Sequence, residues 1–303
     1  MLFMQKVPWQ ADIAEPPSPL IDSNRLPASD RSRRLLAVLA HPDDESLGMG
    51  GTLAKYASEG VETFVLTATR GEGGRFRGHP VGSAEHPGAE ELGRIREAEL
   101  RAAAAALGLR QVALLEYRDQ ELDRAGPREA IGRIVSHLRR IRPDVVITFG
   151  ADGAYGHPDH IAISQLTTAA LVASADPEFQ PSGEPVSTPH AVTKLYYLAW
   201  PVKTWGAYQE ALKKLTVTVD GVERQAVPWP DWMITTSIDT RPYWPTVWKA
   251  VSCHESQIFA YQRLKNISPE HHEALWGSQS FYRAVSMVTG GRTRELDLFD
   301  GIA

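Results

Sequence analysis

The sequence predicts an α/β protein: a mostly parallel sheet with helices on both faces, and a smaller C-terminal α+β extension. Two observations lead to this prediction. Between residues 34 and 175, short apolar runs alternate four times with segments of helical spacing, the pattern of a parallel sheet. After about residue 175 the alternation stops, and a Pro/Ser-rich stretch and Trp-rich segments follow. Ligands of such sheets bind beyond the carboxyl ends of the strands.

The elements of the first part follow from the spacing of apolar residues. Buried strands are predicted where short apolar or β-branched runs stand between turn residues: Leu35–Leu39, Glu62–Thr69, Val112–Leu115 and Asp144–Phe149. Helices are predicted where apolar residues recur every three or four positions: Gly50–Ser58, Glu90–Leu107, Glu129–Arg140 and Asp159–Ala173. Gly108 is expected to end the second of these helices, because glycine adopts left-handed backbone angles without strain.

The second part predicts a different arrangement. A strand is expected at Leu195–Ala199, a hairpin at Leu215–Val227 around Asp220-Gly221, and helices at Pro245–Gln262 and Pro269–Trp276. We therefore divide the chain into an extended, proline-containing arm (1–33), a metal-binding catalytic core (34–175) and a part that completes the sheet and covers the substrate pocket (176–303). Seven of the eight tryptophans lie in this last part, as core packing or as a wall against the substrate.

Composition limits the partners. The 303 residues carry a net charge of −5 and no long Lys or Arg run, so nucleic acid and acidic membranes are not expected partners. The single cysteine, Cys253, excludes an intrachain disulfide and any zinc site built on several thiolates. The sequence has no evident signal peptide and no apolar run of 18 residues, so a cytoplasmic location is expected.

Two strand ends carry far more charge than a buried strand needs. Ala40-His41-Pro42-Asp43-Asp44-Glu45 follows the first strand, and Tyr155-Gly156-His157-Pro158-Asp159-His160 follows the fourth. Parallel strands end at the same edge of a sheet, so the two segments should meet there. Taken alone, a histidine at a strand end is usually a satisfied polar group, and an Asp-Asp pair is usually a helix cap. Together, two imidazoles and a carboxylate suit a divalent metal with open positions, leaving an acid and a histidine for proton transfer.

These two segments resemble the LmbE-like, or PIG-L, N-acetylglucosaminyl deacetylase family, whose members include zinc deacetylases of mycothiol and bacillithiol biosynthesis. The resemblance covers roughly residues 34 to 260. It implies a Rossmann-like sheet and a hydrolase of carbon–nitrogen bonds other than peptide bonds. The implied reaction removes an N-acetyl or other N-acyl group from an amino sugar or a glycoside of N-acetylglucosamine, through a metal-bound water. The implied cofactor is Zn²⁺, although the same donors also bind Fe²⁺.

The resemblance also implies roles for single residues. It implies that the metal ligands are His41, Asp44 and His160. Asp43 is then the general base, and His157 is the general acid or the stabiliser of the tetrahedral intermediate. Tyr155 is expected to donate a hydrogen bond to the developing oxyanion, and Asp159 to orient or charge His157. Substrate contacts are expected, less specifically, from Glu72, Arg96, Asp119 and His254.

Other functions remain open at this point. A related reading is an amidase that cleaves a larger amide, such as a thiol conjugate. A non-haem iron oxygenase also uses two histidines and a carboxylate, but the βα scaffold and the additional Asp and His favour hydrolysis. A binding module that keeps the metal site as a relic would need neither Asp43 nor His157. The expected partner is a small molecule, and a homo-oligomer is left open.

Overall fold

The computed structural model describes residues 32–181, 188–212, 216–219, 221–259, 262–291 and 293–302. Residues Ser32–Ile302 form one compact unit. The predicted arm over residues 1–33 lies almost wholly outside the described residues, and the predicted boundary near residue 175 stays a prediction. None of the helices in the described ranges is both long and apolar enough to cross a membrane.

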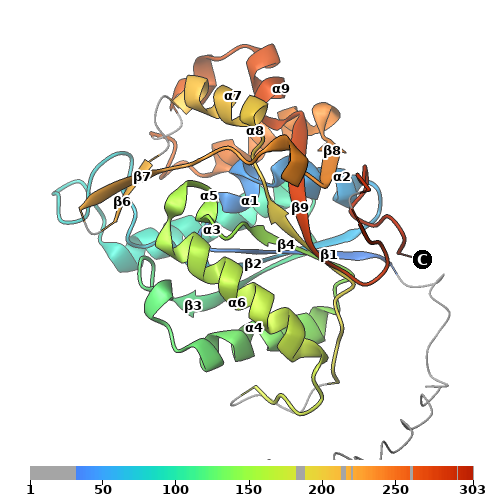
Figure 1. Cartoon of the computed structure of the whole chain (residues 1–303). Helices are drawn as coiled ribbons and strands as arrows, with labels where there is room; N and C mark the ends of the chain where they lie inside the picture. The colour runs from blue at the N-terminus through green and yellow to red at the C-terminus, as the bar shows by residue number, and fades with distance from the viewer. Residues whose placement is uncertain are drawn as a thin grey trace, which may run out of the picture. The chain divides into compact units, whose positions relative to one another are not determined.

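Within these ranges, one seven-stranded sheet has the strand order β3-β2-β1-β4-β5-β9-β8 (Figure 1). From β3 to β5 all neighbours are parallel, while β9 runs antiparallel to both β5 and β8. The strands are β1 (Arg34–Leu39), β2 (Glu62–Thr69), β3 (Gln111–Tyr117), β4 (Val145–Phe149), β5 (Lys194–Leu198), β8 (Thr236–Asp239) and β9 (Ser278–Ser286). The predicted mostly parallel α/β sheet is confirmed.

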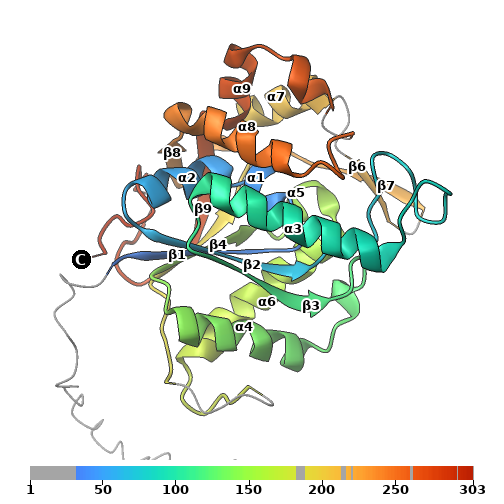
Figure 2. The ribbon, with the colours of Figure 1, turned by 180° about the vertical axis from the view of Figure 1, so that it is seen from behind.

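Helices cover both faces of this sheet. α4 and α6 lie on one face, and α1, α2, α3 and α8 lie on the other, with α7 and α9 beyond α8 (Figures 1 and 2). The first five helices are α1 (Asp44–Leu47), α2 (Gly50–Ser58), α3 (Ala89–Leu107), α4 (Pro127–Ile141) and α5 (Gly153–Gly156). The remaining ones are α6 (Pro158–Ala175), α7 (Val202–Leu212), α8 (Trp244–Cys253) and α9 (Pro269–Trp276).

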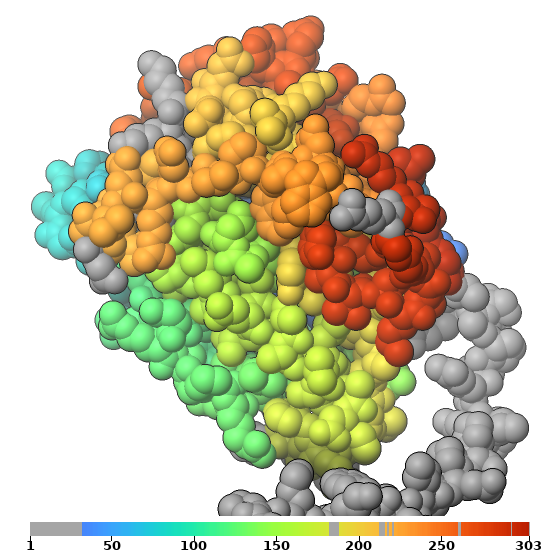
Figure 3. Space-filling view, in the orientation of Figure 1, coloured from blue at the N-terminus to red at the C-terminus, as the bar shows by residue number. Residues whose placement is uncertain are grey.

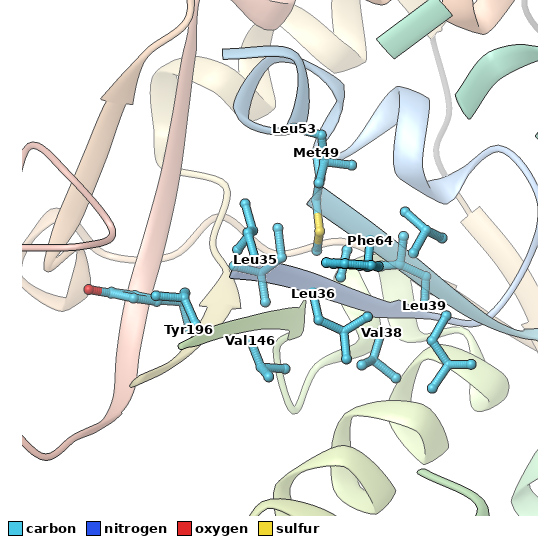
Figure 4. Packing of buried hydrophobic residues seen from close by; sticks show 14 of the residues in the cluster. Leu35, Leu36, Val38, Leu39, Met49, Leu53, Phe64, Val146 and Tyr196 are labelled. Atoms are coloured by element: carbon cyan, nitrogen blue, oxygen red, sulfur yellow. The ribbon is translucent and has the colours of Figure 1, made fainter. Parts of the chain in front are cut away.

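The central strand shows why the apolar runs become strands here. All residues of β1 from Leu35 to Leu39 are fully buried, because β1 has paired strands on both edges and helices on both faces. Figure 4 shows Met49 and Leu53 above β1 and Leu36 below it. Each such side chain contributes about 1.5–3 kcal/mol when it leaves water.

Three elements of the second part were not predicted from the sequence: α7, β8 and β9. Both β8 and β9 are rich in polar residues, and strand pairing decides their conformation rather than an apolar pattern: β9 pairs with β5, and β8 pairs with β9. The predicted helix Pro245–Gln262 is wrong in length, because α8 ends at Cys253. The next residue, His254, leaves helical angles (ψ 60°), and its Nε2 lies 2.8 Å from the buried carboxylate of Glu45.

The predicted hairpin is confirmed as β6 (Thr216–Val219) paired with β7 (Val222–Gln225), while Asp220 lies outside the described residues. The hairpin packs beside α5, where the Arg224 guanidinium lies 3.5 Å from the carbonyl oxygen of Gly156. In Figure 3 the orange surface of this region adjoins the yellow-green surface of α5 and α6. The second part of the chain therefore reaches the end of β4.

Candidate metal centre and active site

The candidate site lies at the carboxyl ends of β1 and β4, which are neighbours in the sheet with Leu36 opposite Val146. The chain builds outward from β1 to β2 and β3, and then returns to the other side of β1 to form β4. Connections leave such a pair in opposite directions and open a crevice between them. The prediction that the two charged segments meet at one edge of the sheet is confirmed.

The turn after β1 separates its two aspartates. The Asp44 carboxylate accepts the backbone N–H of His41 at 2.8 Å, which folds it back beneath the strand end. Asp43 has φ 109° and ψ −24°, a left-handed conformation that is rare outside glycine. Arg96, from α3, donates to Asp43 Oδ2 at 3.2 Å and to the carbonyl of Pro42 at 2.5 Å.

Three predicted metal ligands converge. His41 Nδ1 lies 3.2 Å from His160 Nε2, and the two oxygens of Asp44 lie 3.7 Å and 3.4 Å from these nitrogens. Tetrahedral zinc has ligand bonds of about 2.0–2.1 Å, which places ligand atoms roughly 3.3–3.4 Å apart. The donor types and their separations therefore fit a divalent metal among the three side chains.

Two carboxylates contact the Nε2 atom of the His41 ring. Its Nε2 lies 3.1 Å from Asp119 and 3.1 Å from Asp159, so Nε2 carries a proton and Nδ1 is left to ligate. Against the effect of burial, hydrogen bonds to these carboxylates hold the pKa of His41 well above its ordinary value. Burial likewise opposes the effect of His41 on Asp119, yet the pKa of Asp119 falls to about 2.

An aromatic stack also holds the His160 ring. Its ring lies 3.9 Å from the Phe149 ring at an interplanar angle of 8°, and its Nδ1 has no hydrogen-bond partner among the described residues. Against the effect of burial, His160 and His41 lower the pKa of Asp44. Asp44 is therefore ionised at neutral pH, as a metal ligand must be.

The turn after β4 presents two side chains to the crevice. Ala154 has φ 63°, and the half-buried Tyr155 and His157 follow. His157 Nδ1 accepts the backbone N–H of Asp159 at 3.2 Å, so a neutral ring carries its proton on Nε2. Burial and the neighbouring imidazoles lower the pKa of His157 to about 3. Burial raises the pKa of Tyr155, which therefore keeps its hydroxyl proton.

A cavity of about 260 Å³ opens above these residues. Eight predicted site residues line it: His41, Asp43, Asp44, Arg96, Asp119, Tyr155, His157 and His160. The other lining residues are Leu47, Gly48, Gly74, Gln120, Phe149, Ala154, Trp200, Tyr208 and Gln257. Both strand ends and the second part of the chain thus contribute to one cavity.

Two residues expected to touch substrate do not line this cavity. Glu72 instead accepts the backbone N–H of Asp119 at 2.9 Å, and so supports the turn that carries Asp119. His254 is fully buried, with its Nε2 2.8 Å from Glu45 Oε1. Direct substrate contact from Glu72 and His254 therefore stays a prediction that the cavity lining does not support.

Asp159 also acts on a different histidine from the one expected. Its fully buried carboxylate contacts His41 and accepts the backbone N–H of Gln120 at 2.7 Å and of Leu122 at 3.2 Å. The backbone N–H of Asp159 donates to His157, and its carboxylate acts on that ring by its charge alone. The carboxylate makes its direct contact with His41, a predicted metal ligand.

Three lining residues were not predicted, and only weak signals in the sequence point to them. Trp200 and Tyr208 stack with ring centroids 4.8 Å apart and form one wall of the cavity. The concentration of tryptophans in this part pointed to a wall without indicating which residue makes it. Gln257 also lines the cavity, and its amide donates to the carbonyl of Arg75 at 2.7 Å.

A second set of donors overlaps the first. Ring nitrogens of His41, His157 and His160 also lie within 4.8 Å of one another. His157 lines the cavity beside the metal position, so it can serve either as a further ligand or as a donor to substrate. Its Nε2 proton in the neutral ring favours the second role.

Comparison with known proteins identifies the family. The family model described as PIG-L, GlcNAc-PI de-N-acetylase, matches residues 36–171. A 1D-myo-inositol 2-acetamido-2-deoxy-alpha-D-glucopyranoside deacetylase of Rhodococcus erythropolis is 38% identical, over 89% of this chain and 98% of that protein. The chain belongs to the PIG-L family. The predicted resemblance and the reaction class, hydrolysis of an amide carbon–nitrogen bond, are confirmed.

Further relatives agree. A deacetylase of the same description from Kineococcus radiotolerans is 34% identical, over 95% of this chain and 87% of that protein. Among solved structures, a conserved protein of Thermus thermophilus is 26% identical with a TM-score of 0.58, over 86% and 98% of the two chains. The N,N'-diacetylchitobiose deacetylase of Pyrococcus horikoshii (22% identity, TM-score 0.59, 85% of each chain) shares the fold of this PIG-L member.

Proposed function

We propose that this chain is a metal-dependent deacetylase that removes the acetyl group from N-acetylglucosamine carried in α-linkage on a polyol such as inositol. The observation that carries the proposal is the meeting of Asp43 with the donors His41, Asp44 and His160 in one cavity. The substrate class comes from the relatives, which are deacetylases of an inositol glycoside of this sugar.

The metal itself is part of the proposal. Two imidazoles and one carboxylate suit Zn²⁺, which we infer as the native ion, and Fe²⁺ is the alternative that the same donors accept. A divalent metal held by these side chains supplies polarisation of the amide carbonyl and acidification of a water molecule.

Asp43 takes the proton from the attacking water. Its carboxylate lines the cavity, and the Arg96 contact at 3.2 Å fixes its direction. The same guanidinium places a positive charge beside this carboxylate. This proton then becomes available to the departing amine, which leaves as the glucosaminyl product.

Tyr155 and His157 stabilise the tetrahedral intermediate. Tyr155 keeps its O–H as a donor, since burial raises its pKa. His157 offers Nε2–H, because the backbone N–H of Asp159 occupies its Nδ1. Donors placed where charge develops, in a site with little water, stabilise the transition state more than the substrate.

The rest of the cavity binds the sugar. Arg96, Asp119 and Gln257 supply polar groups for its hydroxyls on one side. Trp200 and Tyr208 supply an aromatic wall on the other side, and such rings pack on the apolar face of a pyranose.

The test is a substrate panel with the zinc-loaded protein. Release of primary amine and of acetate is followed from 1D-myo-inositol 2-acetamido-2-deoxy-α-D-glucopyranoside, from free N-acetylglucosamine and from an N-acetylated thiol conjugate of the same glycoside. We expect the highest kcat/KM for the inositol glycoside, with equal amounts of amine and acetate. A preference for the thiol conjugate would support the amidase alternative, and no amine release from any of them would refute the proposal.

A further inference from the structure

Glu45 is the one acid of the first charged segment without an assigned role. Its side chain is fully buried and outside the cavity, and one of its two oxygens contacts the turn that carries Asp43. Oε2 accepts the backbone N–H of Asp43 at 2.9 Å. Oε1 accepts the hydroxyl of Ser46 at 2.5 Å and lies 2.8 Å from Nε2 of His254, which is also fully buried.

The peptide before Asp43 needs such a partner. A non-glycine residue at φ 109° is strained, and strain of this kind persists only where surrounding contacts enforce it. Two contacts do so from different sides. Glu45 holds the N–H of Asp43, and Arg96 holds both its carboxylate and the preceding carbonyl of Pro42.

One short segment after α8 braces both contacts. His254 pairs with Glu45, and two residues later Ser256 donates its N–H and hydroxyl to Glu99 at 2.6 Å and 2.7 Å. Glu99 lies on α3 one turn after Arg96. The segment therefore supports the carboxylate that holds Asp43 and the helix that carries its guanidinium partner.

We propose that Glu45 and His254 form a buried pair of positioning residues that keep Asp43 in its left-handed conformation, with its carboxylate directed into the cavity. The proposal rests on the proposed function, in which Asp43 is the base. An intact buried pair contributes little to the free energy of unfolding, although removing one partner lowers that free energy strongly. Stability is therefore a weak explanation for the pair, and its contact with the Asp43 turn is a better one.

The first test compares Glu45→Gln with Glu295→Gln. Glu295 is a matched control: it is also a buried carboxylate with several hydrogen bonds, and it lies outside the cavity. We expect Glu45→Gln to lower kcat about 10- to 100-fold with KM and zinc affinity nearly unchanged. Glu295→Gln should lower the melting temperature while leaving kcat unchanged. His254→Gln, which can still donate to Glu45, should retain more activity than His254→Leu.

The second test asks whether the effect passes through Asp43. In an Asp43→Asn background, where the base is already gone, Glu45→Gln should cause no further loss of the residual activity. An equal loss in both backgrounds, or a parallel loss of zinc affinity, would overturn the proposal.

The third test is independent of turnover. Hydrogen exchange of the Asp43 amide should be slow in the wild-type protein, with or without zinc, and at least tenfold faster in Glu45→Gln. Unchanged exchange would also overturn the proposal. If wild-type protein deacetylates none of the substrates but the amide is protected by Glu45, the function proposed above fails while the positioning of Asp43 stands.

Discussion

The two strand ends carry the same triplet, His-Pro-Asp, and use its aspartate in different ways. After β1, both His41, a proposed metal ligand, and Asp43 line the cavity. After β4, His157 lines the cavity, and Asp159 turns inward to support His41. The chemistry of each residue is therefore decided by the backbone that carries it and not by the triplet.

The two aspartates of the triplets also differ in their backbone angles. Asp43 has φ 109°, which turns its side chain away from the direction it would take in a helix. Asp159 lies in the first turn of α6, where Pro158 starts a regular helix. The two carboxylates therefore take different places: Asp43 lines the cavity, and Asp159 contacts His41.

Loss of His41, the histidine of the first triplet, is the largest expected effect. His41→Ala removes one of three donors and leaves two buried carboxylates, Asp119 and Asp159, without their partner. We expect zinc affinity to fall at least 100-fold and activity to become undetectable at stoichiometric zinc. Zinc titration with a chromophoric competitor measures this. Near-native affinity would mean that other donors hold the metal.

The second-largest expected effect is the loss of Asp43, the aspartate of the first triplet. Asp43→Asn keeps the shape of the side chain and the tolerance of asparagine for left-handed angles, but removes the base. We expect kcat to fall about 10²- to 10⁴-fold with zinc content unchanged. Steady-state kinetics and metal analysis of the same preparation decide the outcome, and activity within threefold of wild type would assign the base elsewhere.

The aspartate of the second triplet should behave differently, and this sharpens the comparison. Asp159→Asn weakens the support of His41, so we expect zinc affinity to fall about 10- to 100-fold. At saturating zinc, kcat should recover most of its wild-type value. A lasting loss of kcat at saturating zinc would instead place Asp159 in proton transfer with His157.

The smallest effect concerns stability far from both strand ends. Against the effect of burial, hydrogen bonds from Tyr196, Lys194 and other neighbours lower the pKa of Glu295 to about 2. An unfolded glutamate titrates near about 4.3, so this stabilisation is complete above that pH and is lost as the pH falls toward 2. We expect the free energy of unfolding to decrease by at most about 3 kcal/mol over this range.

Chemical denaturation between pH 5 and pH 2.5 measures this decrease. The Glu295→Gln variant should show a shallower slope than the wild-type protein over the same range. Equal slopes would show that Glu295 is not the group responsible. Since Glu295 lies outside the cavity, this variant should also leave the activity at neutral pH unchanged.

Several elements of both parts could be predicted from local sequence. Gly50–Ser58, Glu62–Thr69 and Pro269–Trp276 have the predicted bounds, because apolar spacing and flanking turn residues define them without help from distant contacts. β9 could not be predicted, because its polar residues become a strand only through pairing with β5 and β8.

The site divides in the same way. The sequence by itself determined that the two charged strand ends share one edge of the sheet, because parallel strands end at the same edge. The resemblance named the three predicted ligands that converge there. Only the tertiary structure decided where each side chain points. It turned Asp159 to His41, buried His254 against Glu45, and brought Trp200 and Tyr208 to the cavity. These outcomes depend on contacts between residues up to 209 positions apart, which no local pattern encodes.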